Sequence, residues 1–190
     1  MDFRVGHSDT CLVSGIRKMG KTHLVKTFIA GQVGRVEYHP DPRRCNKFRK
    51  GVHHIIDDFD KVPMRKLSET VESVQEIAMA GRHSNTGLTI IVHHPTWTAK
   101  EFRLTPDHIF AFRQPSGAAA KWYQTYFGKN VDLLPNMPKY QFLLWSGEHG
   151  IYQGQLVREG RWWNLVAVPL DQERPPGIDI TDTDGSTRSD

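Results

Sequence analysis

Short apolar runs recur along the first two thirds of the chain, and each has the length of a buried β-strand. Helical patterns of apolar residues separate several of these runs, and strands that alternate with helices are typical of a parallel sheet covered by helices on both faces. The pattern therefore predicts an α/β fold on a mostly parallel, five-stranded sheet. The five runs are Cys11–Val13, Val33–Tyr38, Val52–Ile56, Leu88–Val92 and His108–Phe112.

Two stretches have the periodicity of helices. Apolar side chains at Leu67, Val71, Val74 and Ile77 are spaced so that they share one helical face, which predicts a helix from about Arg65 to Arg82. A second helix is predicted over Ala118–Phe127, ending at Gly128.

The pattern changes after Pro138, where three runs are joined by short turns that contain glycine: Tyr140–Trp145, Ile151–Val157 and Trp162–Val168. Such turns connect antiparallel strands, so we expect an antiparallel extension of the sheet. Residues 1–170 are thus predicted to form one domain. Residues 171–190 hold six acidic and two basic residues and are polar throughout, which predicts a disordered acidic tail.

Composition narrows the class of protein. A chain of 190 residues suits one domain, and 38% hydrophobic residues without a long apolar run predict no membrane span. The first residues lack the apolar stretch of a signal peptide, so we expect the protein in the cytosol unless a particle carries it. The net charge is +4 although the tail is acidic, so the body is basic and favours a polyanionic partner such as nucleic acid.

The two cysteines, Cys11 and Cys45, do not form a disulfide framework. Cys11 falls in the first predicted strand and is expected to be buried. Cys45 has His39 and His53 near it in sequence, but no regular four-ligand spacing accompanies them. The sequence therefore predicts no zinc site.

A complete phosphate-binding motif follows the first predicted strand. It reads G-x-x-x-x-G-K-T and consists of Gly15, Ile16, Arg17, Lys18, Met19, Gly20, Lys21 and Thr22. The glycines let backbone N–H groups face phosphate oxygens, Lys21 places a cation on the β- and γ-phosphates, and Thr22 ligates Mg²⁺. A helix is expected to begin near His23. The motif predicts that ATP and Mg²⁺ bind at residues 15–23.

Two adjacent carboxylates, Asp57 and Asp58, follow the third predicted strand. A Mg²⁺ ion on Thr22 needs a carboxylate partner, and hydrolysis needs a group that orients or activates water. We assign the first role to Asp57 and the second to Asp58, with Asp60 as a substitute for either. The alternative is that these are turn or helix-capping carboxylates.

The segment Gly81-Arg82-His83 closes the long predicted helix. In ring ATPases an arginine at this place can reach the γ-phosphate on the neighbouring subunit and act as an arginine finger. Arg82 is our candidate for that role. The alternative is that Arg82 neutralises the C-terminus of its own helix.

The fourth predicted strand ends at His93-His94-Pro95. A polar side chain at this strand tip can hydrogen-bond the γ-phosphate or the attacking water, and an imidazole N–H supplies such a donor. We assign this sensor role to His94, or else to His93. An exposed strand-end histidine without a role in chemistry is the alternative.

A basic run precedes the acidic strand. Its cations are candidates for contacts with DNA phosphates, which do not depend on the base sequence. A solvated loop is the alternative. The five residues are Arg43, Arg44, Lys47, Arg49 and Lys50.

In their order along the chain, these motifs resemble the small genome-packaging ATPases of the FtsK–HerA superfamily. Such proteins occur in membrane-containing icosahedral viruses with double-jelly-roll capsids, turreted archaeal viruses among them. The resemblance covers about residues 8–157 and is carried most specifically by Arg82 and by the segment Leu134–Trp145.

The resemblance implies a P-loop NTPase fold and a homo-oligomeric ring of five or six subunits. It also implies an ATP-driven motor that moves double-stranded DNA into a preformed capsid, in contact with vertex proteins, in the host cytoplasm or at the virion vertex. Two residues depart from the usual pattern: Asp58 stands where Glu is commoner, and His94 where Gln is commoner. The residues to which it assigns roles are Lys21 and Thr22 in the phosphate loop, Asp57, Asp58, His94 and Arg82.

Two other functions are compatible with the motifs. One is a small nucleoside or nucleotide kinase, which would need an acceptor pocket and an arginine-bearing lid that the sequence does not clearly offer. The other is a non-catalytic module whose assembly depends on bound nucleotide.

Overall fold

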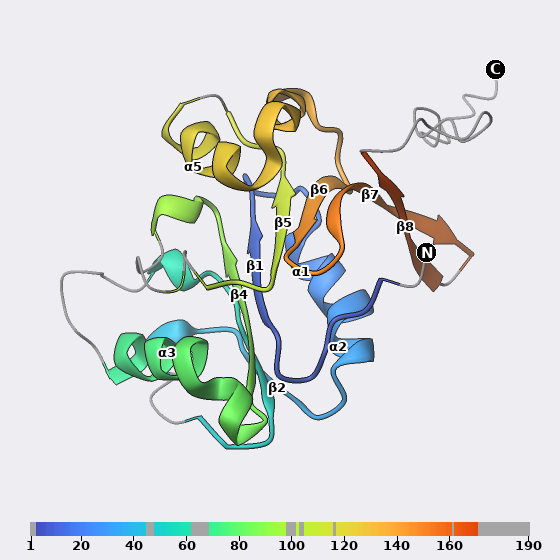
Figure 1. Cartoon of the computed structure of the whole chain (residues 1–190). Coiled ribbons are helices and arrows are strands. Elements are labelled where there is room, and N and C mark those ends of the chain that lie inside the picture. Colours follow the sequence, from blue (N-terminus) through green and yellow to red (C-terminus); the bar gives the residue numbers. More distant parts are fainter. Residues whose placement is uncertain are drawn as a thin grey trace.

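The computed structural model describes residues 3–44, 48–61, 69–97, 102, 105–115, 117–160 and 162–170, and a single twisted sheet runs through its centre (Figure 1). The predicted acidic tail, 171–190, lies outside the described residues. The eight strands of the sheet are β1 Thr10–Ser14, β2 Val36–His39, β3 His53–Ile56, β4 Gly87–Val92, β5 His108–Phe112, β6 Gln141–Ser146, β7 Gly150–Glu159 and β8 Trp162–Pro169.

The sheet has a parallel half and an antiparallel half. Its order is β2-β3-β4-β1-β5-β6-β7-β8, in which the first five strands are parallel and β6, β7 and β8 are antiparallel additions at the β5 edge. This confirms the predicted α/β class, the five-stranded parallel core and the antiparallel extension.

The second strand is shorter than the sequence predicts. We expected it over Val33–Tyr38, but β2 begins at Val36. Val33 closes the preceding helix, and Gly34 has a φ of 76°, in the left-handed region. The apolar character of Val33 reflects burial beneath that helix end rather than membership of the strand.

Helices cover both faces of the sheet (Figure 1). On one face, three consecutive elements form one helical segment: α1 (Lys21–Leu24), a π-helical turn (Val25–Ile29) and α2 (Ala30–Gln32). On the other face lie α3 (Glu69–Ala80) and α5 (Ala118–Phe127), the second of which has the predicted bounds. The helix predicted over residues 65–82 ends two residues early, because the chain tightens into a 3₁₀ turn at Gly81–Ser84. Residues 65–68 lie outside the described residues.

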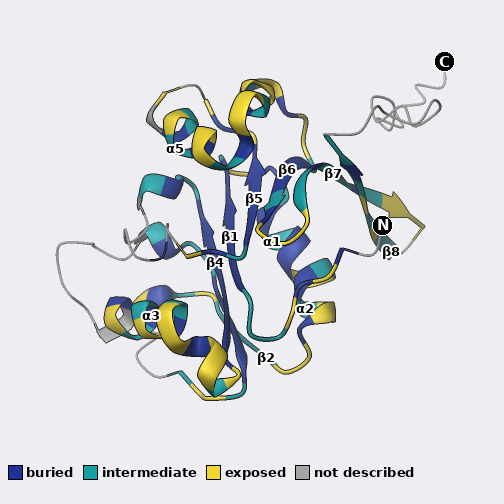
Figure 2. Cartoon of the chain, viewed as in Figure 1, coloured by how far each residue is buried: buried dark blue, intermediate teal, exposed yellow. Residues whose placement is uncertain are grey.

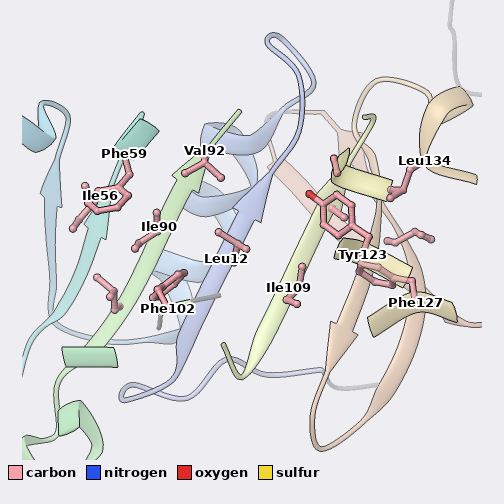
Figure 3. Packing of buried hydrophobic residues seen from close by; sticks show 14 of the residues in the cluster. Leu12, Ile56, Phe59, Ile90, Val92, Phe102, Ile109, Tyr123, Phe127 and Leu134 are labelled. Carbon is pink, nitrogen blue, oxygen red and sulfur yellow. The ribbon is translucent and has the colours of Figure 1, made fainter. Parts of the chain in front are cut away.

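Alternate residues of the parallel strands enter two separate cores. Leu12 and Ile90 pack toward α3 and α5, whereas Val13 and Ile91 pack toward α1. Figure 3 shows the first core, with Tyr123 of α5 among its residues. The central strands β1, β3, β4 and β5 are buried, whereas β2, most of β8 and the outer sides of the helices are half-buried or exposed (Figure 2). Each fully buried Leu or Ile contributes about 1.5–3 kcal/mol to folding, so the parallel half is a rigid support.

Among the described residues, no helix has the length and apolarity needed to span a membrane.

One close contact in the antiparallel half allows a test of this packing. Gly154 of β7 lies opposite Phe142 of β6, and a Cβ on Gly154 would lie 2.4 Å from the Phe142 ring. We expect Gly154→Ala to lower the free energy of unfolding by about 1–3 kcal/mol, because the core has no room for the methyl group. Denaturant unfolding measures this change. Gly31→Ala is the matched control, since nothing lies within 4 Å of its added Cβ. An equal loss of stability in both variants would contradict the packing of β6 on β7.

Candidate nucleotide-binding site

The phosphate loop leaves the C-terminal end of β1 and turns into α1. Its two motif glycines have φ values of 144° at Gly15 and 106° at Gly20, which only glycine adopts without strain. Both also pack closely: a Cβ on Gly15 would lie 2.6 Å from Cβ of Phe112, and one on Gly20 would lie 2.6 Å from the Tyr140 ring. The motif glycines are therefore required by backbone conformation and by packing together.

Two main-chain hydrogen bonds tie the loop to the residue after β5 and the residue before β6. The amide of Ile16 donates to the carbonyl of Arg113, and the amide of Tyr140 donates to the carbonyl of Met19, both at 3.0 Å. Tyr140 itself has a φ of 67°, a conformation that costs free energy in a non-glycine residue. Tyr140, just before β6, therefore holds the phosphate loop in place through its main-chain amide, a role that the sequence did not predict.

Lys21 lies buried at the mouth of the loop. Its ammonium group donates to the carbonyl oxygens of Gly15 at 2.6 Å and Ile16 at 2.9 Å. Burial lowers the pKa of Lys21, while the nearby carboxylates, chiefly Asp57 and Asp58, act in the opposite direction. The side chain is thus a partly desolvated cation that the loop carbonyls hold beside the cavity, where it can neutralise a phosphate.

Asp57 is fixed by three donors. Its Oδ2 accepts hydrogen bonds from the Thr22 hydroxyl at 3.1 Å and from the Tyr38 hydroxyl, and its Oδ1 accepts from the amide of Asp58 at 2.9 Å. Burial, and then the bond to Asp57, raise the pKa of Tyr38, which keeps its hydroxyl protonated as a donor. The sequence missed Tyr38, because only the pairing of β2 with β3 brings it beside Asp57.

The oxygen atoms of Thr22 and Asp57 fit a magnesium ion. They are hard, oxygen-only donors at hydrogen-bond distance, and Mg²⁺ is typically held by one or two such groups together with the phosphates of its substrate. Thr22 and Asp57 are therefore the residues that would hold it.

His93, the second of the two histidines that we named for the strand tip, lies beside the acidic residues. Its Nδ1 lies 2.9 Å from Asp60 Oδ2, and its Nε2 lies 3.8 Å from Asp58 Oδ1. His94 instead contacts the Thr96 hydroxyl through its Nδ1 at 2.6 Å, and burial lowers its pKa. Asp58, with a φ of 50°, is held in a left-handed conformation beside His93.

These side chains line one open cavity of about 420 Å³. Its wall consists of loop residues 17–23 with Asp57, Asp58, His93, Lys139 and Tyr140. The structure therefore brings together most of the predicted phosphate-loop residues and the acidic pair. Lys139, whose ammonium lies over the Tyr140 ring at 4.7 Å from its centroid, adds a cation that the sequence analysis did not assign.

Arg82 lies at the opposite, N-terminal edge of the parallel strands. Its guanidinium pairs with Asp107, just before β5, and the same carboxylate accepts from the amide and hydroxyl of Thr10, the first residue of β1. The phosphate loop begins beyond the other end of β1, roughly 13 Å away at 3.3 Å per residue. Arg82 is exposed, so it faces outward from this edge rather than toward the cavity of its own chain.

The predicted DNA-binding run is only partly described. Arg43 makes two contacts with Asp41, at 2.9 and 3.1 Å, and Arg49 lies 3.9 Å from Glu37. Lys50 is exposed. Lys47 and the side chain of Arg44 lie outside the described residues.

A phosphate loop after the central β1, an acidic β3 tip and a parallel β2-β3-β4-β1-β5 core define a P-loop NTPase fold. No protein-family model matches the sequence, and no curated protein matches it either.

Solved structures share this fold with the chain. One is the genome-packaging NTPase B204 of Sulfolobus turreted icosahedral virus 2 in complex with ATP-γS, with a TM-score of 0.61, 14% identity and coverage of 80% of this chain and 98% of that one. Another is the DNA-packaging ATPase B204 of Sulfolobus turreted icosahedral virus, with a TM-score of 0.59, 14% identity and coverage of 77% and 96%. The conjugation coupling protein TcpA of pCW3 matches with a TM-score of 0.58, 15% identity and coverage of 78% and 60%. The chain therefore has the fold of the packaging ATPases that its motifs resemble.

The two neighbouring histidines give a direct test of the strand tip. We expect His93→Ala to slow ATP turnover by at least about 100-fold, because His93 links Asp58 and Asp60 in the cavity. His94→Ala is the matched control and should change turnover less than about twofold. Single-turnover hydrolysis with saturating ATP measures both. A large loss in His94→Ala with normal turnover in His93→Ala would restore the assignment made from the sequence.

Proposed function

We propose that this chain is an ATP-hydrolysing motor that moves double-stranded DNA into a preformed viral capsid and works as a homo-oligomeric ring. The fold supports the proposal, since the solved structures that share it include genome-packaging NTPases. The observation that carries it is the division of the catalytic groups between opposite edges of one sheet. Lys21, Thr22 and Asp57 lie at one edge, and Arg82 is exposed at the other.

This division favours catalysis between subunits. Because the length of β1 separates Arg82 from the phosphate loop, an arginine finger has to come from a neighbouring chain. The pairing with Asp107 holds the guanidinium in place until a neighbour binds. A ring supplies such a neighbour at every site, whereas a lone subunit leaves its site without the arginine.

In the proposed reaction, water attacks the γ-phosphorus of ATP and the bond to the β-phosphate oxygen breaks. Lys21 neutralises charge on the β- and γ-phosphates, and Asp58 orients the water and accepts its proton. Asp60 holds Nδ1 of His93 at 2.9 Å, so Nε2, which lies 3.8 Å from Asp58, can donate to the γ-phosphate. Mg²⁺, when bound at Thr22 and Asp57, neutralises charge that develops on the phosphate oxygens.

The remaining parts of the proposal concern partners. DNA phosphates would be contacted by the basic run Arg43–Lys50, without reading of bases. The ring would consist of five or six subunits bound to capsid vertex proteins, in the host cytoplasm during assembly or at the virion vertex. These statements rest on the family resemblance and on the basic charge of the body.

A mixing experiment tests catalysis in trans. We expect Lys21→Ala and Arg82→Ala each to abolish DNA-stimulated ATP hydrolysis, the second by about 10³-fold or more while ATP still binds. Mixed together, the two inactive variants should recover part of the activity, because an Arg82→Ala subunit offers an intact phosphate loop and a Lys21→Ala subunit offers Arg82. Arg158→Ala, an exposed arginine on β7, is the matched control and should hydrolyse ATP normally.

Other outcomes would point elsewhere. No recovery in the mixture would contradict an arginine shared between subunits. Phosphate transfer to added nucleosides would favour the kinase. ATP binding without hydrolysis, even with DNA present, would favour a nucleotide-dependent assembly module.

A further inference from the structure

Three side chains that bind transition metals meet on β2 and β3, on the face of the sheet that carries α3. Glu37 lies directly opposite His54 in the parallel register, and His39 lies two residues beyond Glu37, so all three project from the same face. One ligand atom of each residue lies within 4.8 Å of those of the other two. The nucleotide cavity is lined by other residues, so this cluster is separate from it.

The two histidines are already placed as a pair of ligands. Nε2 of His39 lies 3.0 Å from Nδ1 of His54. In a tetrahedral zinc site with bonds of about 2.0–2.1 Å, neighbouring ligand nitrogens are about 3.3 Å apart. An ion can therefore replace the hydrogen between the two rings if the nitrogens move apart by about 0.3 Å and each ring turns until its lone pair points at the ion. Burial lowers the pKa of both rings, which favours the neutral, metal-binding form.

The far side of the His54 ring has the support that metal-binding histidines usually have. Its Nε2 faces the carbonyl of Arg49 at 3.0 Å and the amide of Arg49 at 3.1 Å. When Nε2 carries the hydrogen, it donates to the carbonyl, and the lone pair of Nδ1 then faces His39. A carbonyl in this position fixes the tautomer and orientation of a ligating imidazole.

Glu37 supplies a negative charge at the third corner. It lies half-buried, and its carboxylate is 3.9 Å from the guanidinium of the exposed Arg49. An ion pair of this kind contributes little, so the carboxylate can turn to a bound cation at small cost. Two imidazoles with one carboxylate form a three-ligand set that leaves a fourth position for water.

We propose that Glu37, His39 and His54 form a binding site for one zinc ion, separate from the nucleotide site. The two nitrogen ligands favour zinc over Mg²⁺, which prefers oxygen ligands at octahedral geometry. The ion would bridge the edge strand β2 to β3. Through Arg49 it would also fix the end of the basic run, where the Phe48 ring packs on His54 at 4.8 Å and on His39 at 5.7 Å between centroids.

This site has no signature in the sequence. In the sequence, His39 and His53 lie near Cys45 without a regular four-ligand spacing, and in the structure His53 points to the other face, where it contacts Thr89 at 2.7 Å and the carbonyl of His7 at 2.8 Å. The residue that joins His39 is the next one, His54. Only the register of β2 on β3 identifies it.

Zinc titration of the full chain tests the proposal. The protein is stripped with a chelator, dialysed and titrated calorimetrically with Zn²⁺ in excess Mg²⁺ and without nucleotide. We expect one ion per chain, and an affinity at least about tenfold lower in His39→Ala and in Glu37→Gln. His83→Ala, an exposed histidine outside the cluster, is the matched control and should bind as the parent does. Zinc should also slow tryptic cleavage after Arg49 in the parent chain but not in His39→Ala.

Three results would overturn the proposal. The first is no zinc binding by the parent chain at micromolar concentrations. The second is equal affinity in the parent, His39→Ala and Glu37→Gln. The third is loss of binding in His93→Ala alone, which would place the ion at the Asp58, Asp60 and His93 cluster instead. Circular dichroism of each metal-free variant separates a lost ligand from a lost fold.

Discussion

The hydrogen bond between Thr22 and Asp57 is the contact on which the nucleotide site depends. It joins the loop after β1 to the tip of β3, two strands that are not neighbours, because β4 runs between them. A parallel sheet places the C-terminal ends of its strands at one edge, which is why groups 35 residues apart in sequence meet there. Tyr38 on β2 and His93 after β4 then fix the carboxylates on either side. A change in strand order would separate all of these groups at once.

The same sheet separates Arg82 from the nucleotide cavity within one chain. Its C-terminal edge holds a buried lysine and a carboxylate with three donors, and its N-terminal edge holds Arg82 on Asp107. The strands between them are buried on both faces, so the two edges keep a fixed separation. In the proposed motor, such rigid subunits would assemble head to tail, so that each interface brings Arg82 of one chain to the phosphate loop of the next. The closed ring of such subunits is part of the proposed function.

Much of the fold and part of the site could be predicted from the sequence. Features set by local sequence could be predicted, and features set by the pairing of strands could not. Strand periodicity, helix spacing and the glycines of the phosphate loop are local signals, so α5 and every strand but β2 were predicted to within two residues at each end. Other features depend on which strands pair and in which register. The contact of Tyr38 with Asp57, the approach of His93 to Asp60, and the cluster of Glu37 with His54 follow from tertiary geometry that no local pattern contains. Val33 was wrongly predicted as part of a strand. It is buried at the end of a helix, and a buried residue in either setting is apolar, so the sequence pattern does not distinguish the two.

Magnesium-dependent nucleotide binding tests the central contact most directly. A fluorescent, non-hydrolysable ATP analogue is titrated into the parent chain and into Thr22→Val, each with and without Mg²⁺. The account predicts that Mg²⁺ raises the affinity of the parent chain at least about tenfold and that Thr22→Val loses most of this gain, because a methyl group replaces the hydroxyl that faces Asp57. The account would be contradicted if Mg²⁺ left the affinity of the parent chain unchanged, or if Thr22→Val gained as much affinity from Mg²⁺ as the parent chain does.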